Sequence, residues 1–132
     1  IRDGRIAKIG IINPGEAKET IDAGNQIVAP GFIDVHGHTE NIFNNPAAEN
    51  FIRMGVTSIV TGNCGGSVVN VGTFLNRYSQ TPLAVNLATL IAHGSVRREV
   101  LGTENKQPTA EELAKMEALV EKAMKEGAVG LS

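Results

Sequence analysis

Two histidines one residue apart, His36 and His38, directly follow a short apolar run that predicts a buried strand over residues 32–35. Side chains at positions i and i+2 of a strand point to the same side, so the two imidazoles can face one metal ion. A hydrogen-bonded pair of structural histidines is the alternative explanation of this spacing.

From residue 30 onward, predicted strands alternate with predicted helices, a pattern that indicates βαβ units and a parallel sheet. We expect strands over residues 32–35, 56–61 and 83–92, and the start of a fourth over residues 128–132. Asn45-Pro46 predicts the start of a helix over residues 46–54 that ends at Gly55. An apolar pattern predicts a second helix over residues 71–78. A capping box at residues 109–112 predicts the start of a third helix, which Gly127 ends. Four strands cannot close a barrel, so an open doubly wound sheet is the alternative fold, and we expect the last strand to have no partner.

In parallel α/β folds, functional groups gather at the carboxyl ends of the strands. The residues that end or follow the predicted strands include every histidine and the single cysteine of the chain: His36, His38, Asn63, Cys64 and His93. This coincidence predicts a metal or catalytic site at that edge. Two imidazoles and one thiolate suit Zn²⁺ best.

Other roles stay open for several of these residues. Cys64 can instead be an inert buried thiol, or a nucleophile paired with His93, although no third orienting residue is evident. His93 fits a role beside the ligands or toward the substrate as well as it fits ligation. Arg97 and Arg98 can hold a substrate carboxylate as a bidentate pair, or can be solvated loop charges.

The composition describes one globular domain of 132 residues, 42% hydrophobic and 20% charged. A net charge of −2 provides no basic surface for nucleic acid, and no apolar run is long enough to cross a membrane. Residues 1–29 combine turn dipeptides with short alternating segments, which predicts structural β-strands. The chain opens on Ile1 without a methionine, so we expect that residues precede it. We expect a cytoplasmic protein, with a periplasmic or secreted location left open.

The segment Pro30-Gly-Phe-Ile-Asp-Val-His-Gly-His38 resembles the first-strand signature of the amidohydrolase superfamily, metal-dependent hydrolases built on a (β/α)8 barrel. Four further segments resemble motifs of its D-aminoacylases, or N-acyl-D-amino-acid deacylases: Gly62-Asn-Cys-Gly-Gly-Ser67, Ile91-Ala-His-Gly-Ser-Val-Arg97, Pro108-Thr-Ala-Glu-Glu-Leu113 and Gly127-Ala-Val-Gly-Leu-Ser132. The chain departs from the family in a short stretch between Cys64 and the third strand, and in Val96 where leucine is more usual.

The resemblance implies that residues 30–132 are the first three βα units and the start of the fourth strand of a barrel. Residues 1–29 would then be part of the small β-sandwich that precedes it. By motif, His36, His38 and Cys64 are metal ligands for one or two zinc ions. His93, Arg97 and Asn63 are candidates for contacts with these ligands or with substrate. The catalytic aspartate and the remaining histidine ligands are expected beyond Ser132, so the fragment alone would be inactive.

The implied reaction is hydrolysis of the amide of an N-acyl-D-amino acid to a carboxylate and a D-amino acid, through zinc-bound hydroxide. The alternatives are another amidohydrolase, such as a dihydroorotase-like cyclic amidase or an isoaspartyl dipeptidase, and a non-catalytic amidohydrolase-like scaffold. If residues 1–132 form an autonomous domain, a doubly wound binding module is a further alternative. The expected partner is a small N-acyl amino acid, with neither nucleic acid nor membrane involved.

Overall fold

The computed structural model describes residues 1–132, apart from the side chain of Pro14. The chain divides into two compact units, Ile1–Pro30 and Gly31–Ser132. None of the described helices is both long and apolar enough to cross a membrane.

In the first unit, the described backbone forms an isolated antiparallel bridge between Arg2 and Arg5 and a short 3-10 helix, η1 (Pro14–Glu16). The strands predicted over residues 1–29 are thus not formed in the described backbone. Their apolar side chains have no layer to pack against, since Ile11 and Ile27 are 96% and 94% exposed. Short strands need a partner sheet or helix before they become stable.

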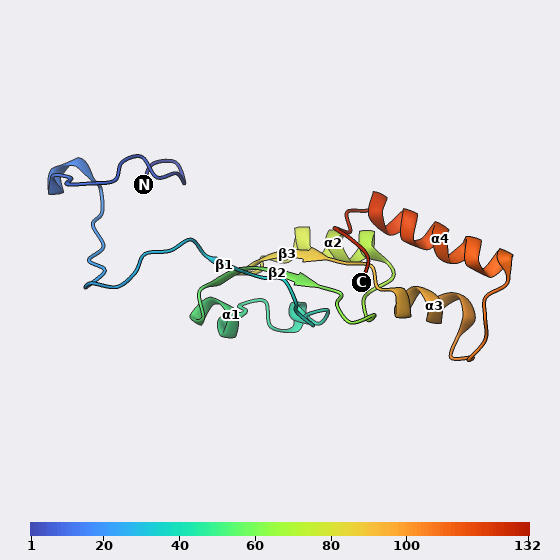
Figure 1. The fold of residues 1–132 in the computed structure, drawn as a ribbon. Helices are drawn as coiled ribbons and strands as arrows, with labels where there is room; N and C mark the ends of the chain where they lie inside the picture. The colour runs from blue at the N-terminus through green and yellow to red at the C-terminus, as the bar shows by residue number, and fades with distance from the viewer. The chain divides into compact units, whose positions relative to one another are not determined.

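The second unit contains a parallel three-stranded sheet in the order β1 (Phe32–Asp34), β2 (Val56–Thr61) and β3 (Asn86–Thr89) (Figure 1). Thr61 pairs with Thr89, so β2 and β3 end together, and both threonines are fully buried. The β-branched run of β2 suits a strand between two neighbours. This confirms the predicted α/β class with parallel strands.

The edge position of β1 overturns the prediction that it is buried. It pairs only with β2, and Phe32 and Ile33 are 60% and 64% exposed. A short apolar run does not reveal how many neighbours the strand will have. Exposure here follows from the position in the sheet rather than from residue type.

The first predicted helix begins later than its sequence signal suggested. A 3-10 helix, η2 (Ile42–Asn44), precedes α1 (Glu49–Arg53), and Asn45 makes no side-chain cap. The Pro46 carbonyl instead accepts a hydrogen bond from the Ala84 backbone N–H, 3.0 Å away. This tertiary contact holds the expected first turn in a non-helical path. Gly55, at a φ of 78°, follows the helix as predicted.

The remaining helices are α2 (Val71–Gln80), α3 (His93–Leu101) and α4 (Ala110–Lys125). The capping box that begins α4 is present, with the Thr109 hydroxyl and the Glu112 carboxylate each accepting the other residue's backbone N–H. The sequence reading missed α3, because it extended the third strand to residue 92, whereas β3 ends at Thr89. His93 therefore begins a helix instead of ending a strand.

Two apolar clusters hold this unit together. The first gathers side chains from α2, α3, α4 and the segments beside them: Val71, Ile91, Val96, Leu101, Met116, Ala123 and Ala128. The second gathers side chains from η2, β2, α2 and the segments beside them: Ile42, Phe43, Ala48, Ile59, Phe74 and Val85.

The last residues of the chain pair with the segment that follows β3. A parallel bridge joins Ile91 to Leu131, and the Val129 N–H donates to the Thr89 carbonyl. The expectation that this segment would have no partner was wrong. It has one on the β3 side.

Candidate metal centre

Three of the predicted site residues meet at the carboxyl ends of β1 and β2. The ligand atoms of His36, His38 and Cys64 all lie within 4.8 Å of one another, and the three residues are exposed. The Cys64 Sγ lies 3.1 Å from the His36 Nε2, and the two imidazole rings are 5.7 Å apart in an edge-to-face arrangement. Exposure leaves the cluster open to an ion and to a further ligand.

The close approach of the histidine segment to β2 depends on the glycine between the histidines. Gly37 donates its backbone N–H to the Val60 carbonyl at 2.9 Å. A Cβ at this position would lie 2.9 Å from the Ile59 Cγ2, too close for ordinary contact. On the preceding side, an Asp34 carboxylate oxygen accepts the His36 N–H at 3.1 Å. These two contacts orient the backbone that carries both imidazoles.

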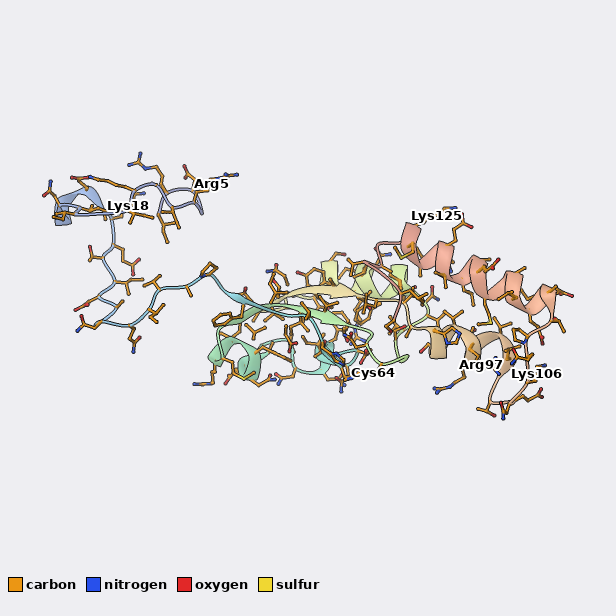
Figure 2. All side chains as sticks on the ribbon, in the orientation of Figure 1. Arg5, Lys18, Cys64, Arg97, Lys106 and Lys125 are labelled. Atoms are coloured by element: carbon orange, nitrogen blue, oxygen red, sulfur yellow. The ribbon has the colours of Figure 1, made fainter. Side chains whose placement is uncertain are left out.

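The loop after β2 presents Cys64 in a strained conformation. Its φ of 55° lies in the left-handed region that residues other than glycine seldom adopt. Asn63, which is buried, donates its side-chain amide to the carbonyls of Val60 and Gly37 at 3.1 and 3.4 Å. Asn63 thus ties the cysteine loop to the turn that carries the histidines. Figure 2 shows Cys64 on this loop.

A half-buried glutamate adds a second tie that sequence reasoning missed. Glu40 accepts the Thr61 hydroxyl at 2.9 Å and the Gly62 N–H at 3.0 Å, both at the Oε1 oxygen. The same hydroxyl accepts the Thr39 N–H at 2.9 Å. No local pattern signals this contact, because Glu40 and Thr61 are far apart in the chain.

His93 and Arg97 lie outside the ligand cluster. His93, at the start of α3, is exposed and lines a groove beside the apolar side chains of Val96 and Met116. An Arg97 Nη2 donates to the carbonyls of Glu104 and Lys106 at 3.0 and 2.7 Å, which holds the loop between α3 and α4 (Figure 2). The guanidinium group is therefore engaged by backbone, and its part in substrate binding stays a prediction.

The donor set fits zinc in kind, and its atoms lie near the spacing of a tetrahedral zinc site. Zinc bonds of about 2.0–2.3 Å in a tetrahedral site place neighbouring ligand atoms roughly 3.3–3.8 Å apart. The 3.1 Å contact between the Cys64 Sγ and the His36 Nε2 is shorter than this range, and the 4.8 Å limit for the whole cluster is longer.

Comparisons with known proteins connect this geometry to characterised enzymes, although no family model matches the chain. The chain is 36% identical to the N-acyl-D-glutamate deacylase and 33% identical to the D-aminoacylase of Alcaligenes xylosoxydans xylosoxydans. Both matches include the whole chain and 32% of the relative. The first extends over 155 positions against 132 residues here, so that relative carries residues in the matched region that this chain lacks.

Solved structures agree with these sequence matches. The N-acyl-D-glutamate deacylase from Bordetella bronchiseptica, complexed with zinc and a phosphonate inhibitor, superposes with a TM-score of 0.74 at 28% identity. The match covers 77% of this chain and 26% of that one. A D-aminoacylase with a binuclear metal centre superposes with a TM-score of 0.71 at 29% identity, over 77% of this chain and 27% of that one. The chain thus spans about a third of the length of the curated relatives that it matches.

Proposed function

We propose that the chain belongs to the D-aminoacylase family of the amidohydrolase superfamily, and that the protein hydrolyses the amide bond of N-acyl-D-amino acids with zinc. The products are a carboxylate and a free D-amino acid. The observation that carries this proposal is the meeting of His36, His38 and Cys64 within 4.8 Å. The relatives named for this activity and the zinc-containing neighbour support it.

In this proposal His36, His38 and Cys64 hold one or two zinc ions. Bound zinc supplies Lewis acidity: it polarises a substrate carbonyl and lowers the pKa of a bound water to about 7. Zinc favours a thiolate and neutral imidazoles as ligands, and these three residues can provide them.

The surrounding residues of this chain hold and orient the ligands. Asp34 fixes the backbone at His36, and Asn63 bridges the histidine turn and the cysteine loop. The carboxylates of Asp34 and Glu40 both accept backbone N–H groups. We therefore assign neither carboxylate as the general base.

We also propose that residues 30–132 form the N-terminal part of a (β/α)8 barrel and that residues 1–29 belong to a small β-sandwich. The parallel order β1-β2-β3 supports the first assignment, because a barrel of this type is built from consecutive parallel strands. Ligands at the carboxyl ends of β1 and β2 agree with the usual location of active sites in such barrels.

The test is metal analysis and deacylase assay of the full-length protein. We expect zinc in the wild-type protein, a severe loss of zinc in His36→Ala and Cys64→Ala, and hydrolysis of N-acetyl-D-glutamate but not of its L-enantiomer. His93→Ala is the matched histidine control for zinc content, because His93 is not in the cluster.

Two results would contradict the proposal. Full zinc content in both His36→Ala and Cys64→Ala would show that these residues do not form a zinc site. A zinc-loaded wild-type protein that cleaves a cyclic amide or a dipeptide, but no N-acyl-D-amino acid, would move the protein to another branch of the amidohydrolases.

A further inference from the structure

We propose that Glu40 is a positioning residue that holds the His38 backbone and the Cys64 loop in the relative placement that zinc requires. This inference rests on the proposed metal site and adds a residue that none of the sequence motifs identified. The carboxylate lies two residues after His38 and contacts the end of β2, where the cysteine loop begins.

One oxygen of Glu40, from the histidine side of the site, accepts two hydrogen bonds from the end of β2. The Gly62 N–H reaches this oxygen directly, from a position two residues before Cys64. The Thr39 N–H, next to His38, reaches it through the Thr61 hydroxyl, which accepts from Thr39 and donates to Glu40. The two backbone segments that carry the ligands are thereby joined by the Glu40 carboxylate and by the Thr61 hydroxyl.

Burial and steric contacts make this connection between the two backbone segments rigid. Thr61 has no exposed surface and Thr39 has 9%, so water competes little for their hydrogen bonds. Gly62 has a φ of 86°, and a Cβ there would lie 2.4 Å from the Leu90 carbonyl oxygen. The loop therefore starts from a constrained position, and Glu40 accepts the N–H that this backbone turn directs toward it.

The role of Glu40 differs from a general contribution to stability. Outer residues that orient metal ligands typically change metal affinity by about 10- to 100-fold when they are removed. Removal of a carboxylate elsewhere in the fold should change stability without changing the rate at which the site releases zinc. Glu126 provides this comparison, because it accepts a backbone N–H from Gly72 in α2 and contacts neither ligand segment.

The experiment measures zinc release from the full-length, zinc-loaded protein into a coloured chelator. We expect Glu40→Ala and Thr61→Val to release zinc about 10- to 100-fold faster than wild type. Glu40→Gln and Thr61→Ser keep the acceptor and the hydroxyl, so they should release zinc at nearly the wild-type rate. Glu126→Ala should also match wild type.

Two further readouts separate positioning from loss of structure. In cobalt-substituted protein, the thiolate-to-cobalt absorption should shift in Glu40→Ala and stay unchanged in Glu126→Ala. In metal-free protein, the amide protons of Thr39 and Gly62 should exchange faster in Glu40→Ala than in wild type. Wild-type release rates and cobalt spectra in both Glu40→Ala and Thr61→Val would overturn the inference.

Failure of the metal site would be recognised separately. If His36→Ala and Cys64→Ala retain zinc, the proposed ligand set is wrong, and the positioning inference is overturned with it. If those variants lose zinc while Glu40→Ala releases zinc at the wild-type rate, the ligand set stands and only the positioning role is refuted.

Discussion

A carboxylate at the end of α4 caps the beginning of α2, and this contact leads to a sharp prediction about stability. Glu126 accepts the Gly72 backbone N–H at 2.8 Å, whereas Asn70, the residue before α2, makes no side-chain cap. The side chain of Glu126 is 27% exposed, so its charge is only partly screened by solvent. Negative charge at a helix amino terminus is favourable.

The size of the effect follows from the two parts of this contact. Glu126→Gln keeps an acceptor but loses the charge, and should lower the free energy of unfolding by about 0.3–1 kcal/mol. Glu126→Ala loses both and should lower it by about 1–2 kcal/mol. Urea denaturation followed by circular dichroism measures both values.

Gly72→Ala tests whether the contact itself is responsible. A Cβ on Gly72 would lie 2.9 Å from the Glu126 Cδ, so the glutamate side chain must move away. In the wild-type background the lost cap offsets the better helix propensity of alanine. In the Glu126→Ala background, Gly72→Ala should raise the free energy of unfolding by about 0.5–1 kcal/mol, through helix propensity alone. The double-mutant cycle should therefore give a coupling energy of about 1 kcal/mol. Additive effects of the two substitutions would refute the capping explanation.

The N-cap backbone N–H and the Lys106 ammonium group lower the pKa of Glu112 from 4.5 to about 2, so its stabilising contribution is present above pH 4.5 and is lost as the pH falls toward 2. Helix content at the start of α4, followed by NMR, should fall in this range, and Glu112→Gln should abolish that dependence. Gly94→Ala would place a Cβ 2.5 Å from the Gly65 carbonyl oxygen and should weaken both folding and zinc binding, whereas Gly66→Ala, with its nearest contact at 3.9 Å, should be nearly neutral in the same assays. Asn63→Ala removes two hydrogen bonds from a buried side chain and should cost about 1–3 kcal/mol in the free energy of unfolding.

Local signals predicted much of the second unit. The run Val56–Thr61 forms the strand that its β-branched residues indicate, and the capping box at Thr109 begins α4 where expected. Both signals act between residues close in sequence, so the chain contains them before it folds. The alternation of strands with helices likewise predicted the parallel sheet.

Local signals failed where a distant contact changed the outcome. Asn45-Pro46 is a good start for a helix, but the hydrogen bond from Ala84 to Pro46 delays α1 to Glu49. The strands predicted in the first 29 residues lack a surface on which to pack. The helix that begins at His93 was not predicted, because the apolar run before it suggested a strand that extends beyond β3.

The same division applies to the candidate site. The spacing of His36 and His38 and the glycine-rich loop around Cys64 are properties of the sequence. The strand expected to orient both imidazoles ends earlier, at Asp34, so the turn after β1 rather than strand geometry sets their direction. The distance between that pair and Cys64 was decided by the parallel register of β1 and β2. Residues far apart in the chain have no local relationship, so only the tertiary structure could place Glu40 beside Thr61 and Gly62 and join the two halves of the site.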